Sequence, residues 1–215
     1  MPMAGIPSHA AEGYLTKLLK LGNKVALCDQ LEPPMPGKLV KRGITRILTP
    51  GTVLEDGQLD GSSNHFLLSF ELDGKGVRAA WLDLSTGKFV LGVWENPHDF
   101  LSLLNSLSPK EILVPEGFEN QLQSVELPVS FKDELERVLG EVTRTERPGF
   151  DFDRRSGARE VMESLGVMNL EGFGIDSKHP ALGPAGAVLV YAQDVLRGKP
   201  GNLRRIEEYR DGEAL

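Results

Sequence analysis

Apolar residues near the start of the chain recur at the spacing of one helix face. They lie three and four positions apart, which predicts a helix over residues 9–21. Two further apolar runs, at residues 24–30 and 39–48, predict strands that end in a turn at residues 49–52. The apolar positions of the helix are Ala11, Tyr14, Leu15, Leu18 and Leu19.

One helix and two strands are too few elements to close a core. Without a partner layer they cannot bury their apolar faces. We therefore expect residues 1–56 to be the C-terminal part of an α+β domain whose beginning is missing from this sequence. Residues 57–64 follow with the Gly, Asp, Ser and Asn composition of a linker or domain boundary.

The middle of the chain has the pattern of a largely buried sheet. Apolar runs at residues 66–72, 77–84 and 88–94 are joined by short glycine-containing turns, which predicts an antiparallel meander. A helix that starts at Pro97 and an apolar strand at residues 111–114 follow. Strand, strand, strand, helix, strand is the order in which a ribonuclease H-like α/β fold with a mixed sheet begins.

Helical patterns dominate the rest of the chain. Residues 119–123 and 133–139 have weak helical patterns, and residues 127–131 have a weak strand pattern. Asp153 can cap a clearer helix that runs to Leu165. A last helix, over residues 181–197, is apolar nearly all round, which indicates packing in a helical layer.

These elements predict an α/β chain in three parts. Residues 1–56 are the expected partial α+β domain, and residues 57–166 are the expected ribonuclease H-like domain. We expect residues 167–215 to be the start of an α-helical domain. No stop signal for a compact fold closes the chain, so both ends are expected to be cuts through a longer protein.

Charge is unevenly distributed along a chain whose formal net charge is −7. Residues 1–56 carry seven Lys and Arg against five Asp and Glu, whereas the remainder is strongly acidic. A net negative chain is not a general nucleic-acid binder, but a local basic stretch can face phosphates or can protect a strand edge. The basic residues of this stretch are Lys38, Lys41, Arg42 and Arg46.

The sequence has no pattern typical of a nucleotide, metal or serine-nucleophile site. It lacks a Gly-x-x-x-x-Gly-Lys-Ser/Thr loop, a Gly-x-Gly-x-x-Gly turn after a strand and a Gly-x-Ser-x-Gly elbow, and its four histidines are scattered. The one cysteine, Cys28, lies in an apolar run that predicts a buried, inert thiol. With no signal peptide and no apolar run long enough for a membrane helix, we expect a cytoplasmic, non-enzymatic chain without a bound metal or a membrane partner.

One pattern of carboxylates leaves a nuclease open as an alternative. A ribonuclease H-like nuclease needs several acids on its sheet to hold divalent metal ions. Asp83 ends one predicted strand and Glu111 begins another. Asp83 can instead accept hydrogen bonds from the backbone of the turn at residues 85–87.

Six segments carry a more specific signal. They are PMAGIPSHAAEGYLTKLLKLGNKVALCDQ, RILTPGTVLED, SNHFLLSF, WLDLSTGKF, LEGFGID and GPAGAVLVYAQDVLRGKPGNLRRIEEY. Together, in order from Pro2 to Leu215, they resemble the MutS family of bacterial DNA mismatch repair proteins, over part of that family's length. The resemblance implies the end of the mismatch-recognition domain at residues 1–56, the connector domain at residues 57–166 and the start of the lever or core domain at residues 167–215.

The resemblance implies that the N-terminal part contacts mismatched double-stranded DNA within the full-length protein. Pro2 and Met3 are implied near the minor groove, and Arg46 is implied at the DNA backbone. The family's Phe-x-Glu wedge has no equivalent here, so we expect weak backbone affinity that falls with salt and does not distinguish mismatches. The implied DNA-binding residues are Pro2, Met3, Lys38, Lys41, Arg42 and Arg46.

The resemblance also implies protein partners. The connector domain links DNA recognition to the levers and offers a surface to MutL, while ATP, magnesium and homodimerisation belong to the full-length family member. The charged face of the helix over residues 154–165 is the expected MutL surface, although such a face can equally be simply solvated. Its residues are Arg155, Arg159, Glu160 and Glu163. A stand-alone shortened paralogue that binds only a protein partner is a further alternative.

Overall fold

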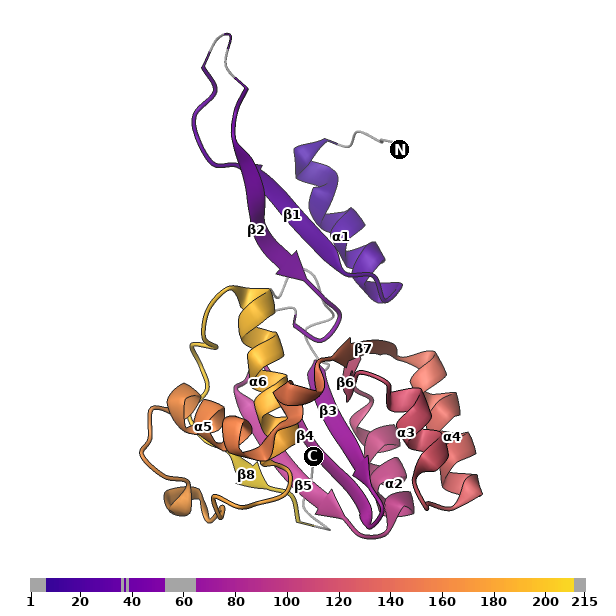
Figure 1. The fold of residues 1–215 in the computed structure, drawn as a ribbon. Coiled ribbons are helices and arrows are strands. Elements are labelled where there is room, and N and C mark those ends of the chain that lie inside the picture. The colour runs from indigo at the N-terminus through magenta and orange to yellow at the C-terminus, as the bar shows by residue number, and fades with distance from the viewer. Residues whose placement is uncertain (1–6, 36, 38, 53–64, 211–215) are drawn as a thin grey trace.

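The computed structural model describes residues 7–35, 37, 39–52 and 65–210. These residues form two units (Figure 1). We call the described part of residues 7–52 the N-terminal unit and residues 65–210 the sheet unit. The linker predicted at residues 57–64 lies outside the described residues.

The N-terminal unit is a helix beside a two-stranded antiparallel sheet. A single 3-10 turn precedes the helix, and Gly22 ends it in the left-handed conformation, with φ +79°. Val25 pairs with Leu48 at one end of the sheet and Gln30 pairs with Arg42 at the other. The elements are η1 (Ser8–Ala10), α1 (Ala11–Lys20), β1 (Val25–Gln30) and β2 (Arg42–Leu48).

This unit buries little apolar surface. Leu19 is its one buried leucine among the described residues, while Tyr14 and Leu18 of the same helix and Leu21 directly after it are exposed. The structure thus agrees with the expectation that one helix and two strands cannot cover their own apolar faces. The predicted burial of Cys28 is wrong, because its side chain is exposed on the two-stranded sheet, where most β1 residues are open to solvent.

The sheet unit is built on six strands in the order β7-β6-β3-β4-β5-β8. β3, β4 and β5 form the predicted antiparallel meander, and β6 pairs parallel to β3. β7 and β8 are further parallel neighbours, of β6 and β5 respectively. The sheet is therefore mixed, as predicted. The strands are β3 (Phe66–Asp73), β4 (Gly76–Asp83), β5 (Lys88–Trp94), β6 (Glu111–Pro115), β7 (Thr143–Arg147) and β8 (Glu207–Glu208).

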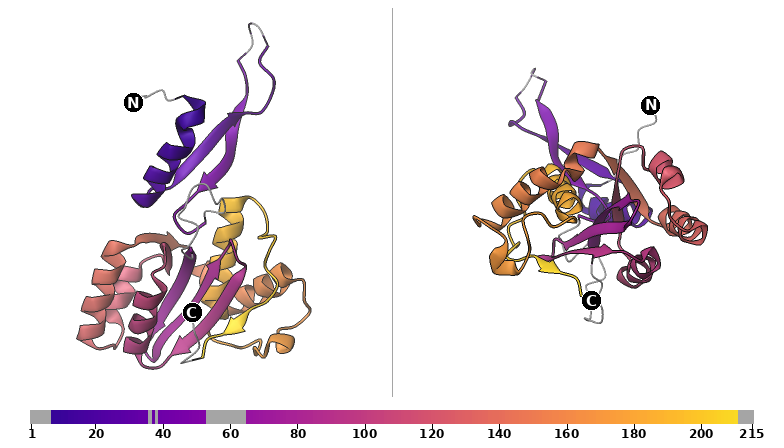
Figure 2. Two further views of the ribbon diagram at one scale, coloured as in Figure 1. Left: turned by 180° about the vertical axis from the view of Figure 1, so that it is seen from behind. Right: turned by 60° about the horizontal axis from the view of Figure 1, so that its bottom comes forward.

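Helices cover both faces of this sheet, so the unit has three layers (Figure 2). Phe66, Leu68 and Phe70 of β3 belong to the core shared with α2, α3 and α4, whereas Leu67 belongs to the core shared with α5 and α6. This division follows from the two-residue period of a strand. The helices are α2 (Pro97–Leu107), α3 (Phe118–Ser124), α4 (Val129–Glu141), α5 (Arg154–Leu165) and α6 (Leu182–Leu196), with 3-10 turns η3 (Gly149–Phe152) and η4 (Glu171–Phe173).

The weak sequence patterns between α2 and α5 predict the structure of this region only in part. The predicted helix at residues 119–123 is confirmed by α3, but the predicted strand at residues 127–131 is wrong. Those residues lead into α4, because Phe131 and Leu135 lie one turn apart and are both buried. β7 was not predicted at all, since its Thr-Arg-Thr-Glu-Arg sequence buries only Thr145 and has no apolar alternation.

The last helix differs from its expected place. α6 packs against the sheet and against α5, and its buried residues belong to the same core as Leu67 and Leu113. After it the chain returns along β5, where Tyr209 N donates to the carbonyl oxygen of Leu91 at 2.8 Å. Residues 167–210 are thus integral to the sheet unit, in contrast to the expected division after residue 166. The physical reason is that an all-round apolar helix can be buried by a sheet as well as by other helices.

Glycines bring α5 and α6 into backbone contact. A Cβ atom on Gly157 would overlap the carbonyl oxygen of Leu182, and one on Gly186 would overlap the Cα atom of Gly157. No side chain fits between the helices at these points. The close packing of α5 on α6 therefore depends on glycine at both positions.

The predicted N-cap of α5 is confirmed. The Asp153 carboxylate accepts a hydrogen bond from Ser156 N at 2.8 Å. This bond to the backbone amide lowers the pKa of Asp153 below its ordinary value. At neutral pH the ionised carboxylate is therefore the form that begins the helix.

We expect Gly157→Ala to lower the free energy of unfolding by about 1–3 kcal/mol, because its methyl group forces the two helix backbones apart. Gly140→Ala is the matched control, since Gly140 lies within α4 and a Cβ atom there meets nothing within 4 Å. It should raise the free energy of unfolding by about 0.5–1 kcal/mol. Urea denaturation measures both, and a Gly157→Ala chain as stable as the parent would show that α5 and α6 are not in backbone contact.

We expect Asp153→Ala to lower the melting temperature at pH 7, and this deficit to shrink as the solution is acidified. A carboxyl group whose folded-state pKa is lowered contributes stability above its unfolded-state pKa of about 3.9 and loses it as pH falls through the folded-state value. Asp153→Asn is the control, because asparagine also caps helices but does not titrate. Thermal melts from pH 7 to pH 2 test this, and a deficit independent of pH contradicts the role of the carboxylate.

Candidate nucleic-acid interface

The predicted basic residues that the structure describes gather on β2 and just before it. Lys41, Arg42 and Arg46 are exposed, and the backbone N–H of Lys41 donates to Glu32 Oε1 at 2.9 Å. Arg42 and Arg46 are carried by the same strand, where they face Gln30 and Leu27 of β1. The predicted residues Pro2, Met3 and Lys38 lie outside the described residues.

A slight irregularity shapes this strand. The register of β1 and β2 shifts between Leu27 and Cys28, which leaves Thr45 as an extra residue on β2. The Thr45 hydroxyl compensates with hydrogen bonds to the Asp29 carboxylate and to the Leu27 carbonyl oxygen. The strand thus presents cationic side chains from a locally fixed backbone, which is suited to holding phosphates.

A buried carboxylate lies where the two units meet. Glu111, the first residue of β6, is fully buried. Its Oε1 atom accepts hydrogen bonds from Thr145 Oγ1 and Tyr191 OH, each at 2.6 Å, and lies 3.3 Å from Lys24 Nζ. Its Oε2 atom accepts from the backbone N–H of Gly51 at 3.2 Å. We call Glu111 with these four partners the junction cluster.

Cations flank the tyrosine of the junction cluster. Lys24 Nζ lies 5.3 Å and the Arg147 guanidinium 5.4 Å from the centre of the Tyr191 ring. Burial and the negative charge of Glu111 raise the pKa of Tyr191, so its hydroxyl remains a hydrogen-bond donor. Arg147 is held in turn by Asp151 at 2.8 Å and Asp194 at 2.7 Å.

A cleft of about 760 Å³ opens beside this junction. The C-terminal ends of α1, α2 and α4 border it, together with Pro50 and His65. Burial, and then the charge of Lys110, lower the pKa of His65, so its imidazole is neutral at neutral pH. The helix C-termini that border the cleft carry partial negative charge, which disfavours anions there.

Asp83 takes the structural role that the sequence left open. Its Oδ1 atom accepts from Ser85 N at 2.8 Å, Ser85 Oγ at 2.6 Å and Thr86 N at 3.3 Å, so it closes the turn between β4 and β5. Within the described part of the chain, His, Cys, Asp and Glu side chains do not gather in threes as a metal site would need. Nor does any helix of the described residues have the length and apolarity to cross a membrane.

The four predicted partner-binding residues on α5 do not share one environment. Arg155, Arg159 and Glu163 have exposed side chains. Glu160 instead turns toward α6, where its Oε1 atom accepts from Gln193 Nε2 at 2.5 Å and from Ser164 Oγ at 3.2 Å. Of the four predicted residues, Arg155, Arg159 and Glu163 therefore lie on the exposed side of the helix, and Glu160 joins α5 to α6.

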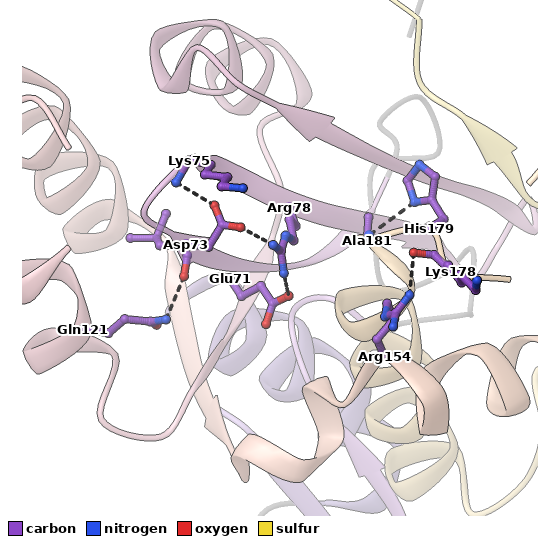
Figure 3. A network of polar contacts seen from close by, with 10 residues as sticks. Glu71, Asp73, Lys75, Arg78, Gln121, Arg154, Lys178, His179 and Ala181 are labelled. Atoms are coloured by element: carbon purple, nitrogen blue, oxygen red, sulfur yellow. Dashed lines mark hydrogen bonds and ion pairs between the residues drawn. The ribbon is translucent and has the colours of Figure 1, made fainter. Parts of the chain in front are cut away.

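A second polar network stabilises the far end of the β3–β4 hairpin (Figure 3). Arg78 pairs with Glu71 at 3.4 Å and with Asp73, while Asp73 Oδ1 accepts from Lys75 N at 2.9 Å. Burial raises the pKa of Glu71 in spite of the neighbouring Arg78. Beside it, Arg154 donates to the Lys178 carbonyl oxygen at 2.8 Å, which ties α5 to the segment before α6. The polar groups of this network pair with one another, and their contacts stabilise the fold.

Sequence reasoning missed the junction cluster. From the sequence, Glu111 is only a possible metal ligand, and Lys24 is simply one of the seven Lys and Arg residues in residues 1–56. The available signal was an acidic residue at the start of an otherwise apolar strand, which needs partners if the strand is buried. Nothing in the sequence pattern identifies those partners, because Lys24 and Tyr191 are 87 and 80 positions away in the chain from Glu111.

Comparison with known protein families identifies both units. Residues 1–57 match the family model of MutS domain I, and residues 65–206 match that of MutS domain II. The second match covers β3 to α6, which agrees with the extent of the sheet unit. The two matched models thus describe the first two domains of the family, in order along the chain.

Curated relatives agree with these matches. The chain is 36% identical over 220 residues to a DNA mismatch repair protein MutS of Symbiobacterium thermophilum, covering 100% of the chain and 24% of the relative. MutS proteins of Phocaeicola vulgatus and Desulfatibacillum aliphaticivorans are 36% and 32% identical, each over 97% of the chain and 23% of the relative. The chain thus spans about a quarter of the length of these relatives. It belongs to the MutS family of DNA mismatch repair proteins.

Proposed function

We propose that this chain forms a non-catalytic part of a mismatch repair protein in which the N-terminal unit contacts the DNA backbone and the sheet unit is the connector. The observation that carries the proposal is that domain I and domain II matches run in order along the whole chain. ATP, magnesium and homodimerisation are predictions for the full-length protein and concern regions outside these two domains.

The DNA contact rests on the basic strand. Lys41, Arg42 and Arg46 are exposed within six residues of one another on an otherwise acidic chain. Such side chains neutralise phosphates and release counterions, so their contribution to affinity falls with salt and is independent of base sequence. Lys38, Pro2 and Met3 extend the same proposal to residues that the structure does not describe. Mismatch selectivity in the family comes from bending soft DNA and wedging a side chain into it, and no equivalent wedge is found in this sequence.

The sheet unit supports a ribonuclease H-like connector. Three antiparallel strands followed by two parallel strands on the β3 side have the connectivity expected of that fold, with helices on both faces. Asp83 is engaged in its turn and Glu111 in the junction cluster, so the two candidate acids support a connector better than a nuclease. We assign this unit the transmission of movement between DNA recognition and the rest of the protein.

The partner surface of the connector is proposed on α5. Arg155, Arg159 and Glu163 project from a helix whose other side is fixed by Gly157 and Glu160 against α6. A rigid helix that presents both charge signs can orient an encounter with a complementary protein. We propose MutL as that protein, on the basis of the family resemblance, with Glu160 acting only indirectly by holding α5 on α6.

We expect the chain to bind duplex DNA weakly, with little difference between matched and mismatched duplexes. The slope of log affinity against log salt should become shallower by about 1 for each of Arg42→Ala and Arg46→Ala, because each variant removes one phosphate contact. Fluorescence anisotropy over a salt series measures the slopes.

The control for this experiment is Arg137→Ala. Arg137 is an exposed arginine of α4 in the sheet unit, paired with Glu134 and Glu141, so its loss changes the net charge equally without touching β2. Equal slopes for the parent and for both β2 variants would remove this strand from the DNA interface. A clear preference for mismatched duplex at fixed salt would contradict the proposed backbone-only contact.

We expect Arg155→Glu combined with Arg159→Glu to weaken capture of the chain by immobilised MutL, because the charges that steer the encounter are reversed. Arg137→Glu, on a helix that covers the other face of the sheet, should leave capture unchanged. Far-ultraviolet circular dichroism checks that the variants are folded. Undiminished capture of the double variant would exclude α5 as the MutL surface.

A further inference from the structure

We propose that the junction cluster is a latch that sets the orientation of the N-terminal unit on the sheet unit. Its centre is the fully buried carboxylate of Glu111, and its four donors divide equally between the units. Lys24 and Gly51 come from the N-terminal unit, whereas Thr145 and Tyr191 come from the sheet unit. This inference goes beyond the proposed function and does not depend on DNA binding.

Lys24 supplies the charged side-chain contact of this latch. Its Nζ atom reaches three groups of the sheet unit at once: it lies 3.3 Å from Glu111 Oε1, 2.6 Å from Thr145 Oγ1 and 5.3 Å from the centre of the Tyr191 ring. Lys24 lies in the short connection between α1 and β1, directly before the first residue of β1, so its position constrains both the helix and the strand. A shift of the unit by even a side-chain length breaks all three contacts.

Gly51 supplies the backbone contact of this latch. A Cβ atom at this position would lie 2.8 Å from Glu111 Cβ and 3.0 Å from Leu67 Cδ1, so only glycine brings its backbone N–H within reach of the carboxylate. On either side of it, Thr49 and Thr52 are buried and their hydroxyl oxygens are 2.8 Å apart. The chain therefore leaves the N-terminal unit along a defined path at the latch.

The energetics favour the closed arrangement of this latch. A buried ion pair contributes little net stability, because desolvation offsets most of its attraction, but loss of one partner leaves an uncompensated buried charge. The Lys24 side chain is 39% exposed, so its ammonium group keeps part of its hydration while it pairs with the fully buried Glu111. Without Lys24, Glu111 keeps Thr145 and Tyr191 as donors but loses this counter-charge, so the arrangement with Lys24 in place is the stable one.

The orientation can be measured directly by pulsed electron spin resonance on the full 215-residue chain. One spin label is attached to Cys28, the chain's single native cysteine, which is exposed on β1. The other is attached through Met168→Cys, because Met168 is 94% exposed in the sheet unit. In this labelled parent we expect one narrow distance distribution.

Lys24→Met keeps the length of the side chain but removes its charge, and we expect it to broaden and shift this distribution. Lys17→Met is the matched control, since Lys17 lies on α1 and stacks on Tyr14 of the same unit, and it should leave the distribution unchanged. Gly51→Ala is an independent test, because its methyl group pushes the backbone away from Glu111, and it should also broaden the distribution.

Unchanged distributions in both Lys24→Met and Gly51→Ala would overturn the proposal. Circular dichroism, recorded on the same samples, shows whether the secondary structure is retained. Broadening with an unchanged circular dichroism spectrum supports a latch. Broadening that accompanies a loss of helical signal in the spectrum would show that Lys24 maintains the fold of its own unit, and it would also overturn the proposal. DNA affinity does not enter either outcome.

Discussion

The relation between the two units depends on the burial of one carboxylate. Glu111 begins a strand that the core requires to be covered on both faces, so its charge cannot reach water. The donors that satisfy it come from the residue before β1, from the turn after β2, from β7 and from α6. Segments far apart in the sequence thus converge on one group, and the N-terminal unit is positioned on the sheet unit by the same contacts that make this burial tolerable.

The contrast between the units follows from their cores. The sheet unit has helices on both faces and two dense apolar clusters, while the N-terminal unit leaves Tyr14, Leu18 and Leu21 exposed. A well-packed sheet is suited to transmitting force, because close-packed interiors deform little. A basic strand on a small, lightly packed unit is suited to contact with a phosphate backbone. This is the division of labour that we propose for the two units, which match MutS domains I and II.

Much of the fold could be predicted from local patterns. The meander, the start of α2 at Asn96 and Pro97, and the Asp153 cap were all visible because their signals lie within a few residues. β7 was missed because its residues are polar, and α6 was assigned to a helical layer because apolarity does not reveal what covers a helix. The basic strand of the candidate site was predictable from composition. The junction cluster was not, because its residues meet only through the tertiary fold.

The most direct test of this account is the amide hydrogen exchange of Gly51, measured by nuclear magnetic resonance on the full chain at neutral pH. Within the part of the chain that the structure describes, its N–H donates to Glu111 across the junction and not to an acceptor of its own unit. The account predicts slow exchange at Gly51, far below that of the unbonded amide of a flexible loop. Exchange at the rate of an unprotected amide would show that the buried carboxylate does not join the two units in solution.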